Sequence, residues 1–404
     1  MWKLLPGKSI KVLSVFGTRP EAIKMAPVVI ELARHSPKVT SKVAVTAQHR
    51  EMLDQAMMHF GLEKHYDLDI MQDNQSLADI TSRVLTRLTP VLRQERPDVV
   101  LVHGDTTTTA ASALAAYYEK IPCGHVEAGL RTGDKYAPFP EEINRKLAGI
   151  VCDIHFAPTQ KARHNLLREG IPQESIFVTG NTAIDALLMT VKEDYTFTDK
   201  ALSLLFDSEQ MCYNNEYSDG TKNIVVEVHR RENFGRGMEN ICQALAAVAR
   251  QRAGEVRFLV SVHKNPNARE PVLRYLSGID NVILFDPLPY PDYVNLISRA
   301  YFVVSDSGGI QEEAPAVGVP VVLCREKTER PEAVEAGTVA LVGTDRALIV
   351  DTITDLLDNE DRYRQMATAK NPFGDGRAAE RIAKALLYWF GLSEERPEDF
   401  ETSR

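Results

Sequence analysis

Two adjacent glycines followed by two glutamates form the segment of this sequence best suited to binding chemistry. The apolar run 301–304 predicts a buried strand, Gly308 and Gly309 follow its end, and helix-forming residues come next. Glycine lets a backbone approach a ligand closely, and the free N–H groups of a helix's first turn suit a phosphate. Glu313 is then placed to reach ribose hydroxyls beyond it. We therefore predict a nucleotide diphosphate site that includes Ser307, and the alternative is an ordinary strand-to-helix turn.

A cluster of basic residues gives the same half of the chain a second anion-binding candidate. The strand predicted over 223–228 ends in His229, Arg230 and a further arginine. In a chain with a formal net charge of −9, this cluster favours an anion site over a solvated basic turn. Tyr293 follows another predicted strand end and could cover a base, although an aromatic residue on an amphipathic helix is more often part of a core.

The first half of the chain repeats the arrangement of strand, glycine and helix. A strand predicted over 11–16 leads through Gly17 into a helix that carries Arg19 and Lys24 near its start. Cations at that end oppose the helix dipole unless an anion binds there. An anion site is therefore one interpretation, and solvated surface charge is the other.

Three carboxylates in this first half are candidates for acid–base chemistry. Asp105 and Glu127 follow apolar runs that predict strands of a parallel sheet, and ligands bind beyond the carboxyl ends of such strands. Glu141 begins a predicted helix after a loop stiffened by prolines, where a carboxylate also suits the helix dipole without any function. Acids in one half and a phosphate site in the other suggest proton transfer on a sugar attached to a diphosphate.

Strands and helices alternate along most of the 404 residues, which are too many for one typical core. We predict an α/β fold of two doubly wound, Rossmann-like domains that face a cleft. The expected segments are an N-terminal domain at 1–190, a polar linker region at 191–222 with a short helix inside it, a C-terminal domain at 223–375, and a final helix and tail at 376–404 that pack on the N-terminal domain.

Composition excludes several other classes of protein. Hydrophobic residues make up 44% and charged residues 25%, as in globular proteins, and the acidic balance argues against nucleic acid as a partner. The five cysteines are scattered, so we expect reduced thiols and neither a disulfide framework nor a zinc site. No apolar run approaches the ~20 residues that span a membrane, and we expect no signal peptide in residues 1–9, which are too short and too polar for one. We expect a cytoplasmic protein.

Taken together, the motifs resemble those of the non-hydrolysing UDP-N-acetylglucosamine 2-epimerases. The resemblance extends over roughly residues 10–385, and an ordered series of motifs is more specific than any single glycine turn. The matching segments are 16–24, 46–55, 103–107, 125–131, 140–142, 229–232, 305–315 and 328–332.

The resemblance implies a glycosyltransferase-B-like fold, a homodimer, and interconversion of UDP-GlcNAc with UDP-ManNAc for envelope polysaccharide. It implies neither a metal nor a redox cofactor. In the reaction it implies, the C2 proton is removed while UDP leaves C1, and UDP then adds back to the 2-acetamidoglucal as a proton arrives on the other face. Such an inversion needs acids on both faces of the ring, with pKa values tuned by their surroundings.

The resemblance also assigns roles to particular residues. The implied catalytic residues are Asp105, Glu127, Glu141 and His229. The implied substrate-binding and UDP-binding residues are Arg19, Lys24, Arg230, Leu288, Tyr293, Ser307, Gly308, Gly309, Glu313 and Arg330. A second UDP-GlcNAc, acting as an activator, is implied near Gln48, His49 and Gln55.

The sequence departs from the family pattern at Glu227 and Val228, where members usually have a threonine and a small residue. A carboxylate beside a diphosphate site repels the ligand or binds an arginine, unless it points away. One alternative function is therefore a UDP-sugar binder with weakened catalysis. Two others are a hydrolysing epimerase that releases ManNAc and UDP, against which the segment 48–50 argues, and a glycosyltransferase of the same fold.

Overall fold

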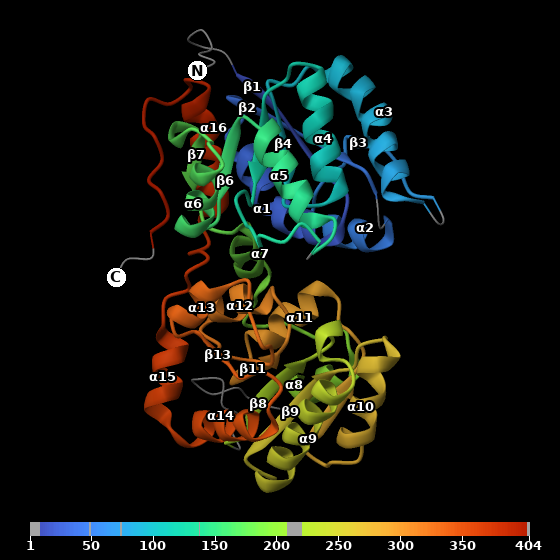
Figure 1. Ribbon diagram of the computed structural model, residues 1–404, viewed down its shortest axis with the longest axis vertical. Coiled ribbons are helices and arrows are strands. Elements are labelled where there is room, and N and C mark those ends of the chain that lie inside the picture. The colour runs from blue at the N-terminus through green and yellow to red at the C-terminus, as the bar shows by residue number, and fades with distance from the viewer. Residues whose placement is uncertain (1–8, 48–49, 73–74, 137, 208–219, 402–404) are drawn as a thin grey trace. The chain divides into compact units, whose positions relative to one another are not determined.

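The computed structural model describes residues 9–47, 50–72, 75–136, 138–207 and 220–401 (Figure 1). By internal contacts the chain divides into two compact units. The N-terminal unit comprises Met1–Ala186 and Phe373–Arg404, and the C-terminal unit comprises Leu187–Pro372. The boundary falls within helix α7 (Thr182–Thr190).

A parallel sheet of seven strands forms the centre of the N-terminal unit, in the order β3-β2-β1-β4-β5-β6-β7. Its strands are β1 (Ile10–Phe16), β2 (Val39–Val45), β3 (Tyr66–Asp67), β4 (Val99–His103), β5 (Cys123–Val126), β6 (Ile154–Ala157) and β7 (Ile176–Val178). Its helices are α1 (Arg19–Arg34), α2 (Arg50–His59), α3 (Leu77–Glu95), α4 (Thr107–Tyr118), α5 (Glu141–Val151), α6 (Gln160–Arg168), the 3-10 helix η1 (Gln173–Ser175) and α16 (Ala378–Trp389).

The sequence explains why these segments take their places. Every residue of β4 is buried, as expected for an apolar strand covered by helices on both faces. Helix α3 buries Ile80, Val84 and Leu88 on one side, and a capping box of Ser76 and Asp79 fixes its start. Helices α3, α4 and α5 pack in one row, and α2, α1 and α16 pack in another, so both faces of the sheet are covered (Figure 1).

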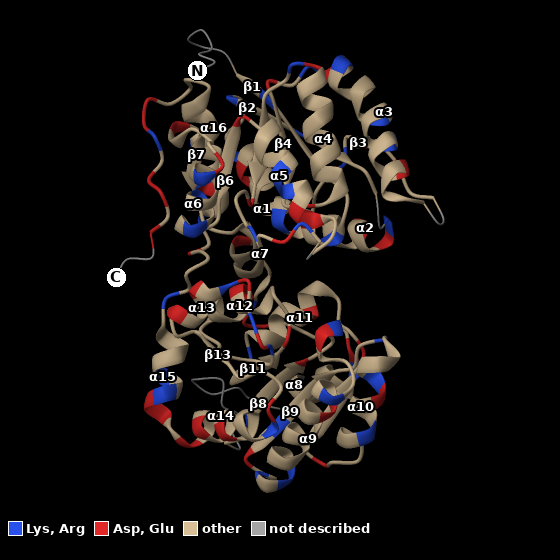
Figure 2. Ribbon diagram, viewed as in Figure 1, with Lys and Arg blue, Asp and Glu red and all other residues tan. Residues whose placement is uncertain are grey.

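The end of the chain also packs on the N-terminal unit. The backbone N–H of Phe400 donates to the carbonyl of Val178, at the end of β7, over 2.7 Å. Asp399 accepts a hydrogen bond from the backbone of Val178 and pairs with Arg163 of α6. Figure 2 shows this last segment as mostly acidic, with one basic stretch between the acidic ones.

The C-terminal unit contains a parallel sheet of six strands in the order β10-β9-β8-β11-β12-β13. Its strands are β8 (Lys222–Glu227), β9 (Val256–Ser261), β10 (Val282–Phe285), β11 (Phe302–Ser305), β12 (Val321–Leu323) and β13 (Val339–Leu341). Its helices are α8 (Lys200–Asp207), η3 (Arg231–Asn233), α9 (Arg236–Gln251), α10 (Pro266–Leu276), α11 (Tyr290–Ile297), α12 (Ile310–Glu313), η4 (Ala314–Val317), α13 (Pro331–Glu335), α14 (Arg346–Asp358) and α15 (Glu360–Thr368).

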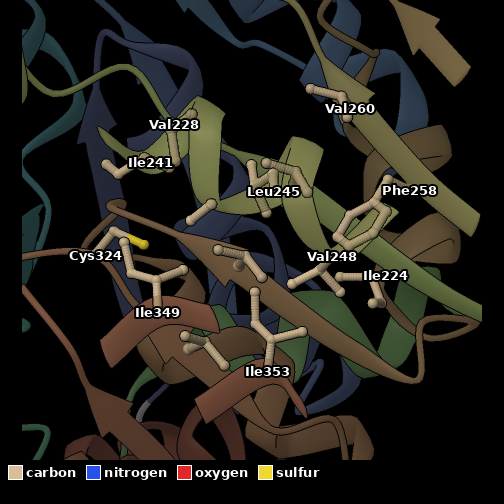
Figure 3. Packing of buried hydrophobic residues seen from close by; sticks show 14 of the residues in the cluster. Ile224, Val228, Ile241, Leu245, Val248, Phe258, Val260, Cys324, Ile349 and Ile353 are labelled. Carbon is tan, nitrogen blue, oxygen red and sulfur yellow. The ribbon is translucent and has the colours of Figure 1, made fainter. Parts of the chain in front are cut away.

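One face of this second sheet packs on α9 and α14 through a continuous apolar core (Figure 3). Ile224 and Phe258 come from neighbouring strands, Leu245 comes from α9, and Ile349 and Ile353 come from α14. All five are at most 1% exposed. Burial on this scale holds the strand ends, and the loops that follow them, in fixed positions.

The predicted fold class is confirmed: both units are doubly wound α/β structures with parallel sheets. The short helix expected between 191 and 222 is α8. Strands β3 and β13 were not predicted, because they are two and three residues long, lie at sheet edges and lack a buried apolar run. Within the described ranges, none of the helices combines the length and the apolar character needed to cross a membrane.

Candidate active site

Each sheet reverses its strand order at one point, and predicted site residues follow the strands on both sides of each reversal. In the N-terminal unit the reversal lies between β1 and β4, which are followed by Arg19 and Asp105. In the C-terminal unit it lies between β8 and β11, which are followed by His229 and Ser307. In open parallel sheets the crevice beyond such a reversal is the usual ligand site.

Glu127 is the most constrained of the acidic residues. It follows β5 with a φ angle of 62°, a left-handed conformation that a glutamate adopts only when its surroundings impose it. Its carboxylate pairs with Lys24 and accepts a hydrogen bond from the Asn181 side chain over 3.0 Å. The carboxylate is therefore anchored by a cation and an amide while its backbone is held in an uncommon conformation.

A buried histidine lies next to this carboxylate. His103, at the end of β4, places Nε2 3.9 Å from the Glu127 carboxylate. Burial lowers the pKa of His103 to about 3, even though the nearby Glu127 acts in the opposite direction. The ring is therefore neutral near pH 7, and it contributes a polar wall rather than a charge.

The turn that leads into Asp105 lies against the Glu127 carboxylate, because the backbone between β4 and α4 turns tightly. Gly104 has a φ angle of 67°, and a Cβ added there would lie 3.7 Å from the Glu127 carboxylate. The Asp105 carboxylate pairs with Arg145 of α5 over 2.5 Å, and its carbonyl accepts a hydrogen bond from Asn144 over 2.9 Å. Each of these two acids is thus paired with a cation, and Arg145 also lies 3.4 Å from Glu142.

The neighbouring Glu141 and Glu142 have different surroundings. Glu142 is fully buried and accepts hydrogen bonds from the backbone N–H groups of Thr132 and Gly133. Glu141 is half-buried, and its Oε2 is enclosed without a hydrogen-bond partner among the described residues. Glu142 therefore shapes the loop, whereas the Oε2 atom of Glu141 makes no such contact in the described part of the chain.

The loop that carries Arg19 is fixed by Glu21. This buried carboxylate accepts hydrogen bonds from the backbone of Gly17 and Thr18 and from the hydroxyl of Thr106, which caps α4. Burial raises the pKa of Glu21, and these hydrogen bonds oppose the shift. One side chain thus joins the turn after β1 to the turn after β4, so Arg19 and Asp105 are positioned together.

The residues assigned to a second sugar-nucleotide site are only partly described. Gln48 and His49 lie outside the described residues. Gln55 is exposed on α2, where the helix start is fixed by ion pairs from Arg50 to Asp67 and Asp69.

Two guanidinium groups meet above Gly308 in the C-terminal unit. A Cβ added to Gly308 would lie 2.7 Å from Nη1 of Arg330 and 3.3 Å from Nη2 of Arg230. The Arg230 Nε is buried and has no hydrogen-bond partner among the residues that are described. Figure 2 shows acidic and basic residues close together around the starts of α12 and α13. The absence of a side chain at Gly308 leaves room for both guanidinium groups, and that of Arg330 is also paired with Glu312 and Glu329.

Asp306 holds the loop that presents His229 and Arg230. Its carboxylate accepts hydrogen bonds from the backbone N–H groups of both residues over 2.9 to 3.1 Å, and from Asn233. The next residue, Ser307, donates its backbone N–H to the Ser305 hydroxyl over 3.0 Å. Helix α12 then begins as predicted, but it is a single turn that continues as η4, so it adds little dipole.

The remaining predicted residues of this unit lie around Tyr293. This tyrosine, on α11, donates its hydroxyl to the Glu227 carboxylate over 2.7 Å, and the Glu313 carboxylate is also close enough to raise its pKa. Leu288 is half-buried in the turn before α11. A Cβ added to Gly309 would lie 3.9 Å from Glu313, which is ordinary contact.

Four residues with direct roles in this geometry were not predicted as site residues: His103, Arg145, Asn181 and Asp306. Their signals in the sequence were weak but present. Arg145 follows Glu141 by four positions and so lies on the same face of α5. Asp306 is a carboxylate directly after a strand that neighbours β8. Within the described part of the chain, no group of three or more His, Cys, Asp or Glu side chains could hold a metal ion.

Comparison with known proteins supports the family resemblance inferred from the sequence motifs. The family model described as UDP-N-acetylglucosamine 2-epimerase matches residues 31–387. A UDP-N-acetylglucosamine 2-epimerase from Yersinia pestis is 54% identical over 378 residues, which cover 93% of this chain and 98% of that protein.

Two solved structures are similar over nearly the whole chain. The UDP-GlcNAc 2-epimerase from Neisseria meningitidis bound to UDP-GlcNAc is 48% identical with a TM-score of 0.82, covering 94% of this chain and 100% of that one. A UDP complex of MnaA from S. aureus is 46% identical with a TM-score of 0.82, covering 97% and 100%. The chain belongs to the UDP-N-acetylglucosamine 2-epimerase family.

Proposed function

We propose that the protein interconverts UDP-GlcNAc and UDP-ManNAc by inverting C2 of the sugar, without net hydrolysis. The observation that carries this proposal is the placement of Glu127, held at a φ angle of 62° with its carboxylate against the turn that leads into Asp105. Backbone strain of this kind persists where function requires a fixed side chain. Family membership supplies the substrate class.

The proposed reaction has two steps, elimination of UDP from the sugar and re-addition of UDP to the intermediate. A carboxylate takes the proton from C2 while the C1–O bond to UDP breaks, which leaves 2-acetamidoglucal and UDP. UDP then re-forms the bond to C1 as a second acid delivers a proton to the opposite face of C2. Asp105, Glu127 and Glu141 are the proposed acids, and the first two are paired with Arg145 and Lys24, respectively.

The leaving diphosphate requires positive charge, and the C-terminal unit supplies it. Arg230 and Arg330 converge above Gly308, and His229 is fixed through its backbone by Asp306. We propose that these cations bind the diphosphate together with Ser307 and Gly309, and that His229 stabilises the charge that develops as the C1–O bond breaks. Arg19, in the N-terminal unit, is a further proposed UDP-binding residue.

The nucleoside is proposed to bind alongside the diphosphate in the same unit. Glu313 binds the ribose hydroxyls, and Tyr293 with Leu288 covers the uracil ring. Lys24 has a double role in this proposal, because it is paired with Glu127 and also carries the charge for a phosphate.

The assembly and location of the enzyme are also proposals. We propose a homodimer formed through α5, on which Ile143, Leu147 and Ile150 are 39%, 48% and 76% exposed at a helical spacing. A second UDP-GlcNAc would act as an activator through Gln55 and the segment before α2. We place the reaction in the cytoplasm, since the four described cysteines are free thiols. The product would feed envelope polysaccharide.

Incubation with UDP-GlcNAc in D2O, followed by proton NMR at C1 and C2, tests the proposal. We expect deuterium at C2 together with UDP-ManNAc, and no lasting release of UDP. UDP that accumulates in step with free ManNAc would assign the chain to the hydrolysing reaction. Neither exchange nor product, with an active relative as control, would reject epimerisation.

A further inference from the structure

Glu227 places a carboxylate at the same strand reversal as the basic residues. It is the last residue of β8, where it pairs in register with Ser305 of β11, and its side chain is 25% exposed. One carboxylate oxygen accepts a hydrogen bond from the Tyr293 hydroxyl over 2.7 Å. The other lies 3.9 Å from Nδ1 of His229.

The orientation of the Glu227 carboxylate matters for anion binding because of the groups around it. The His229 ring stacks on His263 with centroids 5.0 Å apart, and Nδ1 of His229 is buried without a hydrogen-bond partner among the described residues. Rotation of the carboxylate toward this nitrogen would bring a negative charge to the ring proposed to face the diphosphate. The carboxylate and the diphosphate carry like charges, so they would repel each other, and partial burial strengthens the repulsion.

The Tyr293 hydroxyl is well suited to prevent that rotation. Burial, with the Glu227 and Glu313 carboxylates as further causes, raises its pKa well above the ordinary value. The hydroxyl therefore keeps its proton at any working pH and donates a hydrogen bond to Glu227. A hydrogen bond to a charged acceptor is among the stronger ones in proteins.

We propose that Tyr293 holds the Glu227 carboxylate away from the diphosphate, so that the two residues act as a coupled pair that sets the affinity of the C-terminal unit for UDP. Both are positioning residues in this respect, and the role of Tyr293 is additional to covering the base. The inference rests on the proposed UDP site. It also explains how this chain accommodates a carboxylate next to an anion site.

The test uses isothermal titration calorimetry with UDP on the full-length protein and three variants. Tyr293→Phe keeps the ring but frees the carboxylate, and we expect its Kd for UDP to rise about tenfold. Glu227→Gln keeps an acceptor for Tyr293 without the charge, and should bind UDP at least as tightly as the unaltered protein. In the double variant no charge is left to be freed, so its affinity should return to within about twofold of that of Glu227→Gln.

Uridine provides the control ligand, because it has the base and ribose without the diphosphate. The loss in Tyr293→Phe should be seen with UDP and not with uridine, and it should shrink at high ionic strength. If Tyr293→Phe costs as much affinity when it is added to Glu227→Gln as when it is made in the unaltered protein, the inference alone is overturned. Failure of the unaltered protein to bind UDP would overturn the proposed function, and this inference with it.

Discussion

The Lys24 ammonium pairs with the Glu127 carboxylate across two neighbouring layers of the N-terminal unit, from the second turn of α1 to the residue after β5. Replacing Lys24 by methionine removes the charge and keeps most of the volume. Without its cation the carboxylate is less stable in its ionised form, so we expect kcat to fall by about 10- to 100-fold. Initial rates with UDP-GlcNAc measure this effect.

The same measurement separates the two roles proposed for Lys24. If it serves only the nucleotide, KM rises while kcat stays constant, and the assignment to Glu127 fails. Lys38→Met is the matched control, because Lys38 is exposed. It should leave both constants unchanged.

Glu141 and Glu142 offer a pair of adjacent carboxylates with opposite expected behaviour. Glu141→Gln should lower kcat by about 10²-fold or more and leave the melting temperature unchanged, because its Oε2 lacks a partner in the described part of the protein. Glu142→Gln places an amide against two backbone N–H groups, so it should lower the free energy of unfolding by about 1–3 kcal/mol. Thermal melts and initial rates on both variants show which of the two carboxylates is catalytic and which is structural. A destabilised Glu141→Gln with normal kcat per folded molecule would reverse the assignment.

These two residues show what the sequence could and could not reveal. Strand ends were predictable because buried parallel strands are continuous apolar runs, so Asp105, Glu127 and His229 could all be placed just beyond strands. Apart from the family resemblance, nothing in the sequence distinguishes Glu141 from Glu142, since both suit a helix start. The difference lies in which one meets the backbone of residues 132–133.

The features that the sequence could not predict were mainly contacts between segments that are far apart in the chain. Asn181 reaches Glu127 from 54 positions away, and Tyr293 reaches Glu227 from 66 positions away. The sequence flagged Glu227 as unusual for its location but gave no sign of its partner. The left-handed backbone of Glu127 also has no sequence signal, because glutamate has no preference for that conformation.

Three buried histidines on adjacent strands predict acid sensitivity of the fold. Burial lowers the pKa of His103, His125 and His155 from the ordinary 6.5 to about 3, 4 and 3. Between those values and 6.5 the unfolded chain binds protons that the folded chain does not. The stability contributed by the neutral rings is therefore fully present above pH 6.5 and is lost as pH falls toward 3, by at most about 1.4 kcal/mol per pH unit for each histidine.

Denaturant titrations between pH 5 and 8 test this on single variants. His155→Gln should show a shallower fall in unfolding free energy at low pH than the unaltered protein, whereas His164→Gln, at an exposed position, should not. Taking differences removes the contribution of Asp185, whose pKa burial raises to about 6 and which acts in the opposite sense. Identical slopes in all three proteins would show that His155 is not the source.

The exposed apolar residues of α5, Ile143, Leu147 and Ile150, predict a dimer interface. One substitution there should dissociate the dimer into monomers. Leu147→Asp introduces a charge into the proposed interface, so light scattering after gel filtration should show a shift from dimer to monomer. Leu348→Asp on α14 is the matched control, since the two leucines are 48% and 47% exposed. Dissociation by neither variant, or by both, would place the interface elsewhere.

We expect Gly308→Ala to weaken UDP binding more than the same substitution at the neighbouring Gly309. In Gly308→Ala the new Cβ would lie 2.7 Å from Nη1 of Arg330 and 3.3 Å from Nη2 of Arg230, so both guanidinium groups must shift from the proposed anion site. Since these are the ends of flexible side chains, folding should be nearly unaffected, while Kd for UDP rises about tenfold. In Gly309→Ala the nearest contact is an ordinary 3.9 Å to Glu313, and a smaller change, of about twofold, is expected. Calorimetry on both variants measures the difference. Equal affinities would mean that the convergence of the two arginines does not form the diphosphate site.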